Sequence, residues 1–145
     1  MGRERVKSDT SGYPQALGKI ASSLNSPLPL RQTFHLALRS AAKAMNVSGC
    51  ALMLLDSSGR NLLPIASYKL SEWYVKKGIL DVDKSMGETM NGGAVAVLDA
   101  GRDPRVQYGD MAERAGIESI VSVPVKDKSR VIGVFRAYSH ERRRF

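Results

Sequence analysis

The sequence predicts an α+β domain of three layers, in which a central antiparallel sheet of five to six strands has N-terminal helices on one face and short helices and loops on the other. Three observations lead to this fold class. Apolar helical patterns come first in the chain, strand patterns then occur in pairs joined by short turns, and short helical segments separate the two pairs. A doubly wound parallel sheet is excluded, because it needs strict alternation of strands and helices.

The first part of the chain predicts an arm followed by two helices. Residues 1–12 are polar and mixed in charge, which is typical of a flexible arm. Residues 13–24 carry apolar side chains at spacings of three and four, as in a short amphipathic helix. The same spacing recurs over 30–46, directly after Pro27 and Pro29, and gives the clearest helix of the sequence.

Strand patterns begin after this helix. An apolar run over 50–55 and a second run over 62–68 flank the turn composition Asp-Ser-Ser-Gly at 56–59, so a hairpin is expected. Pro64 has no backbone N–H to give to a ladder. The second strand is therefore expected at an edge of the sheet.

The middle of the chain predicts little regular structure. A short helix is expected over 71–77, capped by Ser71 and ended by Gly78. Residues 79–93 are expected to be irregular, with one helical turn at 87–91.

The second half predicts three strands and one helix. Gly116 is expected in the left-handed conformation after that helix. The expected segments are a strand at 94–98, a turn-rich loop at 99–105, a helix at 106–115, and strands at 117–125 and 131–138 joined by a basic turn at 126–130.

Composition bounds the class of protein. A chain of 145 residues with 43% hydrophobic and 25% charged residues fits one soluble domain with its own core. No apolar run approaches the ~20 residues that cross a bilayer, and no secretory signal follows Met1, so no membrane is expected as a partner. The lone Cys50 excludes an internal disulfide and a cysteine-based metal cage, and favours a cytoplasmic location.

The net charge of +8 raises the question of an anionic partner. The basic residues are scattered, apart from Arg142-Arg143-Arg144 near the end of the chain, and aromatic residues make up only 6%. No basic and aromatic interleaving of the kind that binds single strands is present. Nucleic acid is therefore not an expected partner.

Four segments of the second half follow one another in a specific order. They are a strand that ends in aspartate (95–99), an Asp-Pro-Arg turn (103–105), a Gly-Ile-rich strand with a proline near its end (115–125) and a glycine-centred last strand (131–139). With the helix and strand before them, they resemble a GAF domain over about residues 13–139. The resemblance implies a ligand-binding or interaction module of signalling proteins, with an effector domain in the same or a partner protein.

The sequence lacks the residues that several known activities of such domains require. No constellation typical of cyclic-nucleotide binding is found, and Cys50 falls in a strand expected to be buried, away from a bilin. The reductases of this fold need a pair of cysteines. His35 and His140 lie outside the expected pocket, so neither haem nor a Ser-His-Asp site is indicated. The domain is expected to be non-catalytic, and its cofactor is unknown.

The resemblance places any ligand between the sheet and the irregular middle, over residues 71–110. Trp73, Met86 and Met90 are expected to supply wall and lid. Strand alternation puts Val134, Arg136 and Tyr138 on one face, and Ser119 and Ser122 on opposite faces of the neighbouring strand. The candidate ligand-binding residues are Trp73, Met86, Met90, Ser122, Val134, Arg136 and Tyr138.

Arg136 is the most informative of these residues. A guanidinium within a Val-Ile-Gly-Val-Phe run is costly to bury unless an anion or carboxylate faces it. It is interpreted either as a clamp for a ligand anion, or as a rim residue that pairs with Asp99 or Glu118 or extends its stem toward water.

Two functional hypotheses remain open. The first is a regulatory domain that senses a small molecule, and the second is a ligand-free dimerisation or protein-interaction module. A cavity of ~300 Å³ or more reached by Arg136 would favour the first, and a pocket filled by Trp73 and Met86 the second.

Residues 140–145 resemble the approach to a missing final helix, so a fragment is suspected. A homodimer through residues 13–46 is also expected. A PAS-like sensor, the alternative fold, would lack the two leading helices.

Overall fold

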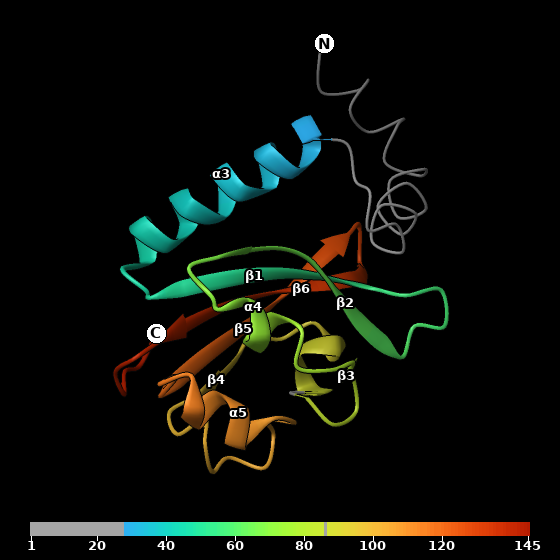
Figure 1. The fold of residues 1–145 in the computed structure, drawn as a ribbon. Helices are drawn as coiled ribbons and strands as arrows, with labels where there is room; N and C mark the ends of the chain where they lie inside the picture. The colour runs from blue at the N-terminus through green and yellow to red at the C-terminus, as the bar shows by residue number, and fades with distance from the viewer. Residues whose placement is uncertain (1–27, 86) are drawn as a thin grey trace.

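The computed structural model describes residues 28–85 and 87–145, and these form one antiparallel sheet with helices on both faces (Figure 1). The arm expected over 1–12 and the helix expected over 13–24 lie outside the described residues. Six strands are hydrogen-bonded in the order β3-β2-β1-β6-β5-β4. The elements are α3 (Leu28–Met45), β1 (Gly49–Leu55), β2 (Asn61–Tyr68), α4 (Glu72–Val75), β3 (Leu80–Asp81), the 3₁₀ helix η2 (Gly87–Asn91), β4 (Val95–Val97), α5 (Gly109–Arg114), β5 (Ser119–Asp127) and β6 (Arg130–Ser139).

The helix α3 lies along one face of the sheet, while α4 and α5 lie on the other (Figure 1). Leu38 and Ala42 of α3 pack with Cys50 of β1, and Phe135 of β6 joins this cluster. The Cys50 thiol donates a hydrogen bond of 3.1 Å to the Leu38 carbonyl, and burial raises the pKa of this thiol to about 11. The expected helix over 30–46 is thus confirmed, and Cys50 is a small core residue.

The hairpin of β1 and β2 confirms the expected edge position of Pro64. The short strand β3 pairs only with Asn61 and Leu62, so the rest of β2 has β1 as its sole neighbour among the described strands. The register shifts between Leu52 and Met53, which face Ala66 and Pro64, respectively, on β2. An extra β2 residue therefore forms a bulge beside the proline, where a missing N–H is tolerated.

The hairpin of β5 and β6 is tighter than expected. Asp127 pairs with Arg130, so the turn contains only Lys128 and Ser129, with Lys128 at φ 58°. Gly133 lies where β6 passes closest to β1. A Cβ built at this glycine would lie 2.3 Å from the backbone oxygen of Met53, so only glycine fits there.

Two expected helices are shorter than predicted. The helix expected over 106–115 begins at Gly109, because the preceding residues bind another segment. The Gln107 side chain accepts a hydrogen bond from the Asp81 amide at 2.8 Å, and the Tyr108 hydroxyl donates to the Ile79 carbonyl at 2.8 Å. These bonds hold β3, a two-residue strand that the sequence did not predict.

The helix expected over 71–77 is confined to α4. Ser71 occupies the N-cap position, but its side chain makes no capping hydrogen bond. The turn after α5 is as expected, since Gly116 has φ 72°.

The C-terminal residues bind back onto the domain. The Arg143 guanidinium donates hydrogen bonds of 2.6 and 3.1 Å to the carbonyls of Asn46 and Met45, which end α3. Arg142 forms ion pairs with Asp99 at 3.0 Å and Glu118 at 3.6 Å. Within the described part of the chain, no helix is long and apolar enough to cross a bilayer.

Candidate functional site

A polar cluster lies beneath the irregular middle of the chain, on the sheet face opposite α3. Arg136 of β6 is at its centre. The sheet register places Ala51 of β1 on one side of Arg136 and Ser122 of β5 on the other. Ser85, which lies just before η2, closes the cluster from above, because its side chain and carbonyl both contact the guanidinium.

Arg136 is almost completely buried, with 2% of its surface exposed. Its Nη2 donates to the Ser85 hydroxyl at 2.8 Å and to the Ser85 carbonyl at 3.3 Å, and its Nε donates to the Ser122 hydroxyl at 3.4 Å. The interpretation of this residue as a rim salt bridge or a stem extending to water is therefore wrong. The two proposed carboxylate partners, Asp99 and Glu118, pair with Arg142 instead.

The charge of Arg136 has no counterion among the described residues. Its partners are the Ser85 and Ser122 hydroxyls and the Ser85 carbonyl, and no ion pair of the described chain includes it. A hydrogen bond between the Arg136 and Tyr138 side chains opposes the rise in the pKa of Tyr138, so a further neutral hydroxyl faces the guanidinium. A buried charge without a paired opposite charge is unfavourable by several kcal/mol, roughly 3–5 where one partner of a buried pair is removed. The site is thus electrostatically incomplete.

Lys77 adds a second positive charge near this site. Its Nζ lies 3.9 Å from the centroid of the Tyr74 ring and donates to the Tyr74 carbonyl at 3.0 Å. Burial, and secondly the charge of Arg136, lower the pKa of Lys77 to about 8. No carboxylate contributes to this shift, so the described structure supplies no negative partner for Lys77 or Arg136.

Two tyrosines complete the wall of the cluster. Tyr74 of α4 and Tyr138 of β6 pack edge to face, with ring centroids 5.8 Å apart. Burial raises the pKa of both phenols, and the positive charge of Arg136 opposes this rise only in part. Both hydroxyls therefore stay protonated at neutral pH and remain hydrogen-bond donors.

Thr89 supplies a further polar group that lacks a partner. It belongs to η2, which packs against β5 and β6, the strands of Ser122 and Arg136. Thr89 is 2% exposed, and its Oγ1 makes no hydrogen bond within the described structure. A buried hydroxyl without a partner is unusual in a native fold and calls for an explanation.

The interior next to these side chains is nearly filled. A cavity of about 20 Å³ lies against Tyr74, Lys77 and Tyr138, which is room for about one water molecule. A second cavity, of about 150 Å³, adjoins the two tyrosines and reaches His140. Neither cavity meets the volume of ~300 Å³ expected for a preformed ligand pocket.

The structure brings four of the seven predicted site residues together. Ser122, Val134, Arg136 and Tyr138 lie on one sheet face, as strand alternation predicts. Met90 packs partly buried against the cluster that contains Val134.

Of the predicted wall and lid residues, Trp73 lies at the surface. It is 46% exposed, and its ring packs edge to face on Tyr74 with centroids 6.1 Å apart. Met86 lies outside the described residues.

The sequence interpretation missed four residues of the cluster: Tyr74, Lys77, Ser85 and Thr89. Only one signal pointed to any of them. Tyr74 and Lys77 are three positions apart in a predicted helix, which puts them on one face of it. Ser85 and Thr89 lie in a segment without periodicity, so no pattern could assign them.

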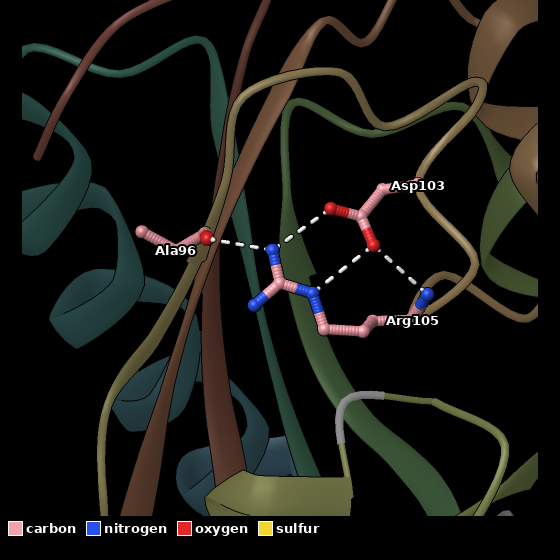
Figure 2. A network of polar contacts seen from close by, with 3 residues as sticks. All are labelled: Ala96, Asp103 and Arg105. Carbon is pink, nitrogen blue, oxygen red and sulfur yellow. Dashed lines mark hydrogen bonds and ion pairs between the residues drawn. The ribbon is translucent and has the colours of Figure 1, made fainter.

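The Asp-Pro-Arg turn has a structural role (Figure 2). The Arg105 guanidinium donates to both carboxylate oxygens of Asp103, at 2.8 and 3.0 Å, and reaches the Ala96 carbonyl at 3.4 Å. Ala96 belongs to β4, an end strand of the sheet, so Arg105 covers one of its unpaired carbonyls. This ion pair lowers the pKa of Asp103 and attaches the loop to the sheet.

The fold and the sequence together identify the family. The GAF domain model matches residues 29–145, and the chain belongs to the GAF family. No curated protein sequence matches the chain.

Solved structures show the same fold. The GAF domain of a phosphoenolpyruvate-protein phosphotransferase from Coxiella burnetii is similar with a TM-score of 0.67 and 17% identity, over 94% of this chain and 83% of that one. A domain described as part of a two-component sensor histidine kinase from Sinorhizobium meliloti gives 0.63 and 19%, over 83% and 78%. A NreA protein from Staphylococcus aureus, mutated in its nitrate binding site, gives 0.64 and 16%, over 77% and 86%.

Proposed function

We propose that this GAF domain is a non-catalytic sensor, which binds a small molecule at the Arg136 cluster and passes a conformational change to an effector domain. The observation that carries the proposal is the buried guanidinium that has only neutral partners among the described residues. A buried charge without a counterion destabilises the fold. A ligand that binds the guanidinium would offset this penalty and would favour the ligand-bound conformation.

One structural relative supports a small ligand for a domain of this fold. The NreA protein is described as mutated in its nitrate binding site, and it shares this fold at 16% identity. That likeness shows the architecture only, so the ligand of this chain has to be argued from its own residues.

Ligand entry requires a movement of the middle segment. The cavity beside Tyr74 and Tyr138 holds about 20 Å³, so a ligand of several atoms must displace side chains or the segment that carries Ser85 and Thr89. Ser85 is tied to Arg136 by its hydroxyl and its carbonyl. A ligand that replaces these bonds would release this segment, and that is the conformational signal we expect.

The second candidate is a ligand-free interaction module. The small interior cavities favour it, because a core filled by its own side chains leaves nothing to sense. In either case, we propose a homodimer through residues 13–46, an effector domain in the same or a partner protein, and a cytoplasmic location.

Thermal unfolding of the chain with a panel of metabolites, nucleotides and salts separates the two candidates. A ligand at a hundred times its dissociation constant adds about 2.7 kcal/mol to the free energy of unfolding. We expect at least one compound to raise the midpoint saturably in the native chain. An absence of any saturable shift would favour the ligand-free module.

Two serines of β5 provide a matched pair of variants. Ser122 contacts Arg136, whereas Ser119 lies on the opposite face of the strand and binds the Glu141 carbonyl; both are fully buried. Ser122→Val is expected to reduce the shift caused by the ligand, and Ser119→Val to leave it unchanged relative to its own midpoint. Equal losses in both variants would place the ligand elsewhere.

A further inference from the structure

We propose that the ligand of this site is a small oxyanion, held by the Arg136 guanidinium with Lys77 as a second positive charge and with buried hydroxyls as further donors. The inference rests on the proposed function, and it adds the charge and the size class of the ligand. It is drawn from this chain's own donors, charges and cavity volumes.

The first argument is the excess of donors over acceptors. The described cluster contains two cations and the hydroxyls of Ser85, Thr89 and Ser122, and no carboxylate pairs with either cation. Every partner of the Arg136 guanidinium among the described residues is neutral. A planar guanidinium presents its N–H groups in a fork that matches two oxygens of one oxyanion.

The second argument is the Thr89 hydroxyl. It is buried, it makes no hydrogen bond in the described structure, and its helix η2 packs on the strands of Ser122 and Arg136. An oxyanion on the guanidinium would offer an acceptor on the sheet face that η2 covers. The same ligand would thus neutralise the unpaired charge of Arg136 and accept a hydrogen bond from the unpartnered Thr89 hydroxyl.

The third argument is size. The interior cavities measure about 20 and 150 Å³, and the walls are large aromatic side chains. A nucleotide or a tetrapyrrole would require the removal of these side chains from the core. An oxyanion of a few heavy atoms requires only a local displacement of the segment that contains Ser85.

The surroundings of Lys77 agree with an anion site. The groups that face its ammonium are the rings of Tyr74 and Tyr108 and, by charge, Arg136. None of them is negative, and burial, followed by the charge of Arg136, lowers the pKa of Lys77. A cationic ligand would meet two positive charges, and a neutral ligand would leave both uncompensated.

The test measures thermal unfolding of the whole chain against sodium nitrate, formate, bicarbonate and phosphate, with sodium chloride at equal ionic strength as the reference. Succinate is added as a larger carboxylate. We expect a saturable rise of the midpoint with at least one of the small oxyanions, and no such rise with chloride. A response to succinate but to none of the smaller anions would contradict the size argument.

The variants assign the effect to the site. Arg136→Gln is expected to weaken anion binding at least about 30-fold, as for the loss of one partner of a buried charge pair. Arg105→Gln, which removes a half-buried charge paired with Asp103 outside the cluster, is the control and should bind as the native chain does. If Arg136→Gln does not fold, Lys77→Met and Ser85→Ala replace it, and each should weaken binding. Unchanged affinity in both of these would overturn the proposal.

The outcomes also separate this inference from the proposed function. A saturable shift given only by neutral or cationic compounds would refute the oxyanion and leave the sensor in place. No shift with any compound would refute both. A rise with nitrate or phosphate that persists in Arg136→Gln would show an anion effect elsewhere on the +8 chain and would also overturn the inference.

Discussion

Gly133 lies in the middle of β6, where the strand has neighbours on both sides and the backbone of β1 passes unusually close. A Cβ at this position would lie 2.3 Å from the Met53 carbonyl oxygen and 2.7 Å from Cδ2 of Leu54. The carbonyl cannot move without breaking the pairing of β1 and β6. The glycine is therefore a condition for the register that brings Ala51, Arg136 and Ser122 into line.

We expect Gly133→Ala to lower the free energy of unfolding by about 3 kcal/mol, the upper range for overpacked sites, because a backbone atom opposes the new methyl group. Chemical denaturation measures this loss. Gly93→Ala is the matched control, since a Cβ at Gly93 meets no atom within 4 Å. Equal stability of the two variants would contradict the close approach of β6 to β1.

Lys77 predicts a specific pH dependence of stability. Its pKa is about 8 in the folded chain against an ordinary value of 10.5, so between these values the unfolded chain binds more protons than the folded one. The desolvation penalty is fully present below pH 8 and is relieved as the pH rises, so the contribution of Lys77 to stability increases from about pH 8 to about 9.5. Above that range Tyr74 and Tyr138 ionise in the unfolded chain but not in the folded one, because burial raises their pKa, and this lowers the stability.

The measurement is the difference in unfolding free energy between the native chain and Lys77→Met across this range. The subtraction matters because the Cys50 thiol, whose pKa is raised, contributes in the opposite direction as the unfolded chain ionises. Lys76→Met, which removes an exposed neighbour paired with Glu72, is the control. A difference between native chain and Lys77→Met that stays constant with pH would mean that Lys77 is solvated.

At the scale of the elements, the turn between β1 and β2 depends on Asp56. One carboxylate oxygen accepts from the Ser58 hydroxyl at 2.6 Å, and the other accepts from the Asn61 side chain at 2.9 Å. These hydrogen bonds, that of Ser58 foremost, lower the pKa of Asp56 to about 2 from 3.8. The charged carboxylate therefore stabilises the hairpin above about pH 4, and this contribution is lost as the pH falls toward 2.

Asp56→Asn is expected to cost about 1 kcal/mol at pH 7, the usual range for charge-assisted hydrogen bonds at a partly solvated turn. Acid titration of stability should show the native chain converging on the variant between about pH 4 and 2. Ser57→Ala alters an exposed residue of the same turn and should follow the native curve. A constant gap between native chain and Asp56→Asn down to pH 2 would refute this role for the carboxylate.

The same scale shows which elements the sequence could predict. The helix α3 and the two hairpins rest on local patterns, namely apolar periodicity and turn residues, and these determine them almost alone. The strand β3 has only two residues and exists because Gln107 and Tyr108, from far along the chain, hold it. The same contacts shorten α5. No local pattern contains such a contact.

The candidate site divides in the same way. Alternation along β5 and β6 placed Ser122 and Arg136 on one face, because a strand fixes the direction of its side chains. The partners of Arg136 could not be predicted, since Ser85 comes from a segment without periodicity. The expected carboxylates were taken by Arg142, a residue of the C-terminal tail whose position depends on the whole fold.

At the scale of the whole molecule, β6 contributes to both faces of the sheet, the face of the Arg136 cluster and the face that α3 covers. Its inner face carries Arg136 and Tyr138, and its outer face carries Phe135, which packs under α3. A shift of β6 caused by a ligand would therefore reach the helix through a single strand. This arrangement makes α3 a suitable output surface, and it bears on the proposed homodimer.

The outer side of α3 exposes Leu36, at 59%, and carries Arg39 and Lys43, and the helix has no acidic residue. Two copies that meet through residues 13–46 would bury this leucine and bring like charges together. We therefore expect a dimer in sedimentation velocity that becomes tighter as salt screens the repulsion.

Leu36→Glu should shift the chain to monomer. Ile79→Glu, at 60% exposure and on the opposite side of the sheet, is the matched control and should remain a dimer. A monomer at micromolar concentration in both low and high salt, or equal effects of the two variants, would contradict dimerisation through this helix.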